Sequence, residues 1–290
     1  MDIVNAFMYV YMYELEQFLI KNKNKIANIS FQSDEANTDR QLKEFLKRIV
    51  ENSFNKIPDD SIINTVNIED KVSFSNNNDV LKKIYIDKVL LPEEIDSDVK
   101  EILKKDKNSI YTNPDLCFRI INDNETFYKT IELKSTKNNS IPGSSIQQIN
   151  PTEWVIFIKH TNSNIEITTG QYINAINSKM EFPDRSPRPQ VSFKELQDWN
   201  NSNRIFNNYT LTYNSDNINQ VMKSELIYDW QKVLVDKWID VLFDFSEPRN
   251  NAPWFNNTLR KFILAFTYKY DNLSKQEQDD YKENIKKIIK

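Results

Sequence analysis

The chain contains only two glycines, Gly143 and Gly170, among its 290 residues. The dinucleotide-binding fingerprint G-x-G-x-x-G and the phosphate-binding loop G-x-x-x-x-G-K-[ST] need closely spaced glycines, which let the backbone approach a phosphate group. Neither pattern can be written with two glycines that lie far apart in the sequence. The sequence therefore excludes the nucleotide-binding folds that depend on these loops.

Histidine and cysteine are scarcer still, with His160 and Cys117 as the single examples of each. A structural zinc site needs four nitrogen or sulfur ligands and a catalytic one usually three, so a zinc protein is nearly excluded. One cysteine cannot form an intrachain disulfide, and there is no G-x-S-x-G turn for a serine nucleophile. Any bound metal would sit among carboxylates and backbone carbonyls, which favours Mg²⁺, Mn²⁺ or Ca²⁺.

Length and composition indicate a globular protein with a core. The chain is 39% hydrophobic, and 38 basic against 42 acidic residues give a net charge of −4. This charge argues against a protein that coats nucleic acid nonspecifically, but it allows a local basic cleft. Residues 1–20 are apolar and lack the basic start of a signal peptide, and no apolar run reaches the roughly 18 residues of a membrane helix. We expect a buried N-terminal helix in a cytoplasmic protein without a membrane segment.

Hydrophobic periodicity predicts helices toward both ends of the chain and strands in its centre. The predicted helices are 40–54, 92–107, 144–149, 171–178, 192–199, 219–245, 254–270 and 275–289. The predicted strands are 116–121, 127–133, 154–159, 165–168 and 208–213, and 182–189 is a proline-rich loop. This order predicts an α/β fold with a mixed central β-sheet flanked by helices and with additional helical N- and C-terminal parts. We expect a single domain over 1–290, with a catalytic core at about 39–180 and a helical C-terminal part at about 190–290.

The most informative stretch, residues 111–148, is predicted to contain a hairpin. Its two strands are joined at Asp123 and Asn124. Pairing outward from this turn sets Asp115 directly across from Glu132, where opposite Cβ atoms lie roughly 5 Å apart. Side chains alternate along a strand, so Glu132 and Lys134 share one face while Leu133 points to the other. The hairpin therefore gathers two carboxylates and an amine on one face and apolar side chains on the other.

This cluster suits the hydrolysis of a phosphodiester. Two close carboxylates repel each other, and a divalent cation relieves that repulsion. A bound Mg²⁺ would lower the pKa of its water and polarise a phosphoryl oxygen. Lys134 could orient or deprotonate the attacking water and offset charge on the phosphate.

In Pro114, Asp115, Glu132 and Lys134, with the apolar Leu133 between the last two, the sequence resembles the PD-(D/E)XK nucleases, and more narrowly the type II restriction endonucleases. The tail after Lys134 is also similar, and the resemblance covers about 40 to 60 residues. It implies a restriction-endonuclease-like fold and Mg²⁺-dependent, sequence-specific cleavage of double-stranded DNA, with Mn²⁺ as a substitute metal. It implies metal ligands at Asp115, Glu132 and the backbone carbonyl of Leu133, with Lys134 acting on the water. It further implies a homodimer and a cognate DNA methyltransferase in the same system.

Other interpretations of these residues remain open. A rival motif combines Pro58-Asp59 with Glu69-Asp70-Lys71, but Asp70 is charged where Leu133 is apolar. Glu132 and Lys134 could instead form surface ion pairs on an exposed strand. The chain could then be a non-catalytic scaffold that binds DNA or protein, or a non-specific or structure-specific repair or phage nuclease of the same fold. Glu44 and Glu51 fall opposite the apolar stripe of helix 40–54, which favours a solvated face.

Two segments carry candidate DNA-binding residues. Gln147 and Gln148 follow the catalytic lysine and could reach adenine edges or phosphates, or could only fix their loop. Arg185, Arg188 and Gln190 lie in the proline-rich segment, where arginine and glutamine can pair bidentately with guanine and adenine. The alternative for this segment is a structural loop with solvent-facing arginines.

Overall fold

The computed structural model describes residues 3–27, 35–68, 72–75, 80–106, 114–142, 150–161, 164–177, 189–215, 217–243 and 254–289. Its helices are α1 (Ile3–Lys21), α2 (Lys23–Ala27), α3 (Glu35–Ser53), α4 (Ser97–Asp106), α5 (Tyr172–Ala175), α6 (Phe193–Asn203), α7 (Asn217–Phe243), α8 (Trp254–Asp271) and α9 (Lys275–Ile288), with 3₁₀ turns η1 (Leu81–Lys83) and η2 (Pro92–Glu94). Its strands are β1 (Thr65–Ile68), β2 (Val72–Ser75), β3 (Tyr85–Leu90), β4 (Leu116–Asn122), β5 (Glu125–Thr136), β6 (Ser140–Pro142), β7 (Trp154–His160), β8 (Ile165–Gln171), β9 (Gln190–Ser192), β10 (Arg204–Asn207) and β11 (Thr210–Tyr213).

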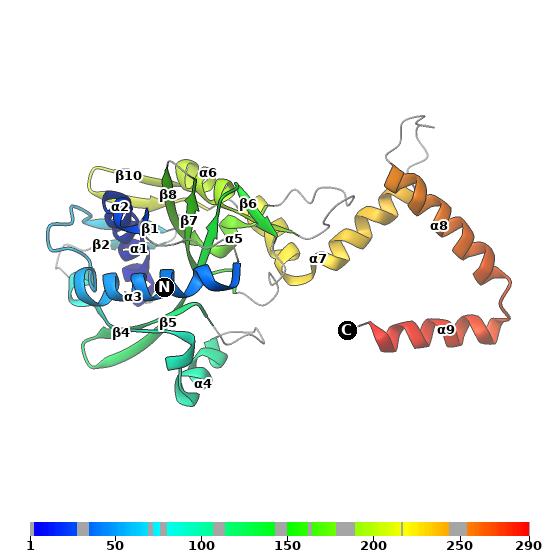
Figure 1. Ribbon diagram of the computed structural model, residues 1–290, viewed down its shortest axis with the longest axis horizontal. Coiled ribbons are helices and arrows are strands. Elements are labelled where there is room, and N and C mark those ends of the chain that lie inside the picture. Colours follow the sequence, from blue (N-terminus) through cyan, green and yellow to red (C-terminus); the bar gives the residue numbers. More distant parts are fainter. Residues whose placement is uncertain are drawn as a thin grey trace. The chain divides into compact units, whose positions relative to one another are not determined.

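A five-stranded sheet in the order β3-β4-β5-β7-β8 forms the centre of the fold. Strands β5 and β7 run parallel, whereas the other neighbours are antiparallel, so the sheet is mixed. Helix α1 packs on one face (Figure 1). On the other face, α4 packs against Cys117, and Phe157 meets Phe193 of α6 with ring centroids 5.5 Å apart. The predicted α/β architecture, a mixed sheet flanked by helices, is confirmed.

Helix α1 is buried on nearly every side, as an apolar helix without a polar face should be. Eleven of its 19 residues are buried. Its one buried carboxylate, Glu16, accepts hydrogen bonds from the Thr169 backbone (2.5 Å) and from Arg204 (2.5 and 3.0 Å). The predicted buried N-terminal helix is confirmed, and the charge of Glu16 is neutralised by Arg204 of β10.

Two smaller sheets complete the β-structure. One has the order β10-β11-β1-β2, with β1 and β11 parallel, and the other pairs β6 with β9. The sequence predicted only a strand at 208–213 in this part of the fold. The helix predicted over 171–178 is shorter than expected, because β8 continues through Gln171 and α5 covers only Tyr172–Ala175.

One of the two glycines, Gly170, lies where α6 packs closely on β8. A Cβ atom at this position would lie 2.6 Å from Cδ1 of Leu196 on α6. A larger residue at position 170 would therefore require the Leu196 side chain to move.

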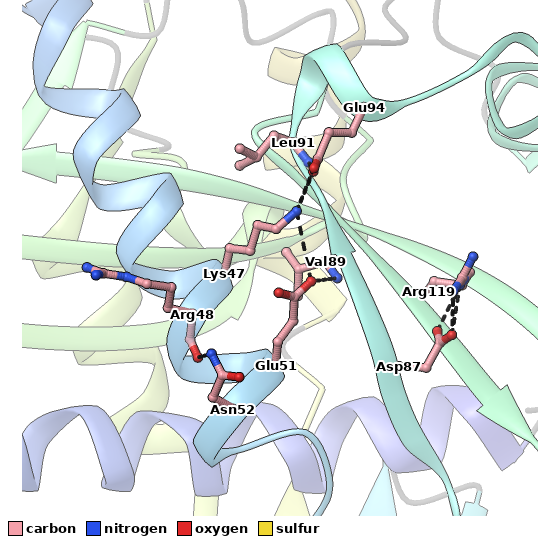
Figure 2. Close-up of polar contacts among 9 residues, drawn as sticks. All are labelled: Lys47, Arg48, Glu51, Asn52, Asp87, Val89, Leu91, Glu94 and Arg119. Atoms are coloured by element: carbon pink, nitrogen blue, oxygen red, sulfur yellow. Dashed lines mark hydrogen bonds and ion pairs between the residues drawn. The ribbon is translucent and has the colours of Figure 1, made fainter.

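Helix α3 is held to the edge strand β3 by polar contacts (Figure 2). Glu51 accepts a hydrogen bond from the backbone N–H of Val89 at 2.9 Å, and Lys47 bridges to Glu94 at 2.5 Å. The expectation that Glu51 lies on a solvated face is therefore wrong, because its carboxylate binds the backbone of β3. Glu44 is half exposed and pairs only with Arg40 on its own helix in the contacts that the structure shows.

Contacts along the chain divide it into two units. One comprises Met1–Met180 and Arg188–Trp230 and holds the three sheets; the other comprises Glu181–Pro187 and Gln231–Lys290 and is helical where it is described. Helix α7 contributes to both and departs from helical geometry at Asp229, with φ −153° and ψ 74°. Within the described ranges, none of these helices combines the length and apolar character needed to cross a bilayer.

Candidate active site

The β4–β5 hairpin has the register that the sequence predicted. Leu116 pairs with Ile131 at one end and Asn122 with Glu125 at the other. The turn holds Asp123 at φ 53°, in the left-handed region that aspartate tolerates better than most residues. Because this pairing continues outward from Leu116 and Ile131, Asp115 lies beside the end of β5 that carries Glu132.

Asp115 is held by one contact at each oxygen of its carboxylate. Its Oδ2 accepts a hydrogen bond of 2.8 Å from the backbone N–H of Leu133, and its Oδ1 lies 2.8 Å from Nζ of Lys43 on α3. Its side chain is 16% exposed. The carboxylate thus extends the ladder between β4 and β5 by one hydrogen bond, although Asp115 itself precedes β4.

The backbone carbonyl of Leu133 faces the same edge. Along a strand, the N–H and C=O of one residue point to the same neighbour, and the N–H of Leu133 is directed at Asp115. If the hairpin register is continued, Leu133 lies opposite Pro114. Proline has no N–H, so Pro114 cannot donate to this carbonyl as a ladder partner would. By this strand geometry the Leu133 oxygen is directed toward the segment that contains Pro114 and Asp115.

Glu132 and Lys134 contact each other on the opposite face of β5 from Leu133. Their side chains are 12% and 22% exposed. Burial raises the pKa of the Glu132 carboxyl to about 7; Lys134 opposes this rise through its charge and hydrogen bond, while Asp115 and Glu153 add to it. The site therefore holds interacting carboxylates in a poorly solvated position, where a cation would be stabilised.

Two further residues of this cluster were not predicted from the sequence. Glu153 is buried and directly precedes β7, which pairs with β5 so that Val155 lies next to Glu132. Tyr172 donates its backbone N–H to the Glu153 carbonyl at 2.8 Å. The pKa of the Tyr172 hydroxyl is raised by burial and then by the charges of Glu132 and Glu153. The sequence did carry a signal for Glu153. It lies two residues before Val155, and side-chain alternation places both residues on the same face of an apolar strand.

The donor set suits a hard cation. Asp115, Glu132 and the Leu133 carbonyl offer only oxygen atoms, and Mg²⁺ in proteins often binds one or two carboxylates and keeps several waters. No three His, Cys, Asp or Glu side chains come together as a complete metal site in the part of the chain that the structure describes. A metal here would therefore depend on water and substrate oxygens for the rest of its coordination.

The other predicted site residues are only partly described. Gln190 lies on β9, where its side-chain oxygen accepts a hydrogen bond from Ser140 at 2.8 Å. Gln147, Gln148, Arg185 and Arg188 lie outside the described residues, as do the helix expected over 144–149 and most of the loop 182–189.

The rival motif is likewise described only at its first acid. Asp59 lies on an exposed turn, with its carboxylate 2.9 Å from Nζ of Lys56. Glu69, Asp70 and Lys71 fall outside the described residues.

Comparisons with protein-family models, with curated proteins and with solved structures find no match to this chain.

Proposed function

We propose that this chain is a Mg²⁺-dependent endonuclease that cleaves double-stranded DNA at specific sequences, as a type II restriction endonuclease does. The observation that supports it best is the hydrogen bond between Asp115 and the backbone of Leu133, together with Glu132 and Lys134 on the same strand. These are the residues that carry the resemblance to the PD-(D/E)XK nucleases. The mixed sheet with helices on both faces is compatible with a restriction-endonuclease-like fold.

The residues of the site divide the work of phosphodiester hydrolysis. Asp115, Glu132 and the Leu133 carbonyl would hold Mg²⁺, which supplies an acidified water and a positive charge near the phosphate. Lys134 orients that water and offsets the charge that develops on the phosphate. Lys43 balances the charge of Asp115 and restricts its orientation.

Recognition of DNA is assigned to residues outside this cluster. Gln147, Gln148, Arg185, Arg188 and Gln190 are the candidates for contacts with bases and phosphates. A two-fold homodimer would read a palindromic site, and a cognate methyltransferase would protect the host DNA. The protein would then act in the cytoplasm.

Digestion of plasmid DNA tests the proposal. We expect discrete fragments with Mg²⁺ or Mn²⁺, none with EDTA, and stronger binding than cleavage with Ca²⁺, because hard oxygen ligands bind all three ions but Ca²⁺ is the poorer catalyst. A smear or nicked circles would favour a non-specific or structure-specific nuclease.

An unchanged plasmid would favour the non-catalytic scaffold. The ion pairs Lys134–Glu132 and Lys43–Asp115 give that alternative its support, because they satisfy both acids without a metal. Cleavage that persists in EDTA would contradict the metal-dependent mechanism.

A further inference from the structure

A group of lysines lies at the carboxyl ends of the parallel strands β5 and β7. Lys137 directly follows β5, and Lys159 is the residue of β7 that pairs with Thr136 at the end of β5. Lys194 lies in the first turn of α6 and donates its backbone N–H to the carbonyl of Asn139 at 3.4 Å. Strand pairing and this hydrogen bond therefore gather Lys137, Lys159 and Lys194 around the turn that follows β5. We call these three residues the basic patch.

The basic patch carries more positive charge than the acids beside it neutralise. Lys137 and Lys194 are exposed, and neither forms an ion pair with an acid that the structure describes. Two acids beside the patch are already paired, Glu166 with Lys159 at 3.7 Å and Glu195 with Lys223 at 3.9 Å. Because the whole chain has a net charge of −4, this local surplus of positive charge favours an anionic partner.

Lys159 lies on the same face of the sheet as the candidate active site. Lys134 precedes Thr136 by two residues on β5, and Thr136 pairs with Lys159, so side-chain alternation places all three on one face. Nζ of Lys159 lies 5.8 Å from the centroid of the Phe193 ring, which keeps this amine beside the first turn of α6. Two residues of a strand span roughly 7 Å, and a DNA strand carries one phosphate for about every 3.4 Å of helix axis. A duplex that lies along β5 at the candidate active site therefore reaches the patch within a few phosphates.

We propose that the basic patch binds the phosphates of a DNA duplex beside the candidate active site. Lysine amines neutralise phosphates, and contacts of this kind position a duplex without reading its sequence. Three amines spread over a strand, a turn and a helix suit an extended polyanion better than a single phosphate ion. The choice of duplex DNA as the partner rests on the proposed function, but the binding itself requires neither cleavage nor a metal.

Fluorescence anisotropy with labelled duplexes of two unrelated sequences, using the full chain in EDTA, tests the proposal. For the variant Lys137→Ala/Lys159→Ala/Lys194→Ala, we expect at least about 10-fold weaker binding at about 50 mM salt. The slope of log affinity against log salt should become shallower by about 2 to 3, since each phosphate contact contributes about 0.9. Both duplexes should lose affinity equally, because phosphate contacts carry no sequence information.

Two further variants make the result specific to the basic patch. Lys194→Ala alone changes one exposed side chain and should make the slope shallower by about 1. Lys83→Ala/Lys104→Ala/Lys261→Ala removes the same charge from three exposed lysines on other elements. This control should keep the affinity and the slope of the unaltered protein.

Three results would overturn the proposal. The first is the absence of duplex binding at about 50 mM salt by unaltered protein whose thermal unfolding shows that it is folded. The second is an unchanged salt slope in Lys194→Ala and in the triple variant of the patch. The third is an equal loss in the control, which would assign the effect to net charge alone. Because binding is measured without metal, a plasmid that is bound through the patch but stays uncut would refute the nuclease and leave this proposal standing.

Discussion

Glu132 changes its protonation near neutral pH, because burial raises the pKa of its carboxyl from 4.5 to about 7. A carboxyl whose pKa is higher in the folded state stabilises the fold while it is protonated, and this contribution is lost as the pH rises toward 7. In the absence of a cation, stability is therefore expected to fall between pH 5 and 8.

The variant Glu132→Gln isolates this effect, because glutamine does not titrate. We expect its free energy of unfolding, measured by urea denaturation in EDTA, to rise relative to the unaltered protein between pH 5 and 8 by up to about 3 kcal/mol, at about 1.4 kcal/mol for each pKa unit. Glu44→Gln, at a half-exposed position on α3, should follow the unaltered protein. Parallel pH profiles for Glu132→Gln and the unaltered protein would contradict a raised pKa.

Asp115→Asn tests the role of the second acid. Asparagine keeps an oxygen that can accept the hydrogen bond from Leu133, but it removes the charge that would bind a metal. We expect DNA cleavage to fall by at least about 100-fold, with binding to specific DNA in Ca²⁺ retained or improved. The exposed Asp59→Asn serves as the matched control, and an equal loss of cleavage in it would favour the rival motif.

At the scale of elements, α8 and α9 leave large apolar side chains in solvent. The exposed fractions are 61% for Phe262, 73% for Leu264, 75% for Tyr268 and 77% for Ile288. The first half of α9 carries Glu277, Asp279 and Asp280, whereas its last turn carries Lys286 and Lys287. Asp279 and Lys286 pair within the helix with Lys275 and Glu283, while two antiparallel copies of α9 would bring Glu277 and Asp280 close to Lys287 of the other copy, which favours a second copy of this chain as the partner.

We therefore expect a homodimer that Leu264→Glu weakens, because a charge in an apolar interface loses its hydration. Light scattering at micromolar protein should show a dimer for the unaltered chain and a shift toward monomer for the variant. Ile62→Glu places the same charge at another exposed apolar position, 55% exposed, and should not change the mass. A monomer for the unaltered chain would count against this interface.

Local sequence patterns predicted the elements that are long enough to show a clear periodicity. Four residues of the stripe on α3, Leu42, Phe45, Leu46 and Val50, are buried as expected. The hairpin register followed from its turn, since both strands meet at Asp123. The four-residue strands β1 and β10 were missed, although their partners β2 and β11 are close in sequence, because so short a segment carries too little periodicity.

Across the whole molecule, the sequence could predict the residues of the candidate site that lie close together in the chain. It could not predict those that distant elements contribute. Asp115, Glu132 and Lys134 lie on one hairpin, so counting from its turn brings them together. Lys43, Glu153 and Tyr172 reach the cluster from α3, from the start of β7 and from α5. Their positions depend on the order of strands in the sheet and on helix packing, which no local pattern specifies.

The burial of α1 has a consequence for synthesis of the protein. This helix leaves the ribosome before β10 and β11, yet its Glu16 is neutralised by Arg204, and its Tyr9 carbonyl accepts a hydrogen bond from Tyr213 at 3.0 Å. Until these residues emerge, Glu16 lacks its charged partner and the packing around this apolar helix is incomplete, which makes the nascent chain prone to aggregate. Completion of the sheet unit must therefore wait until β10 and β11 have been synthesised, and a chaperone that shields α1 would be needed until then.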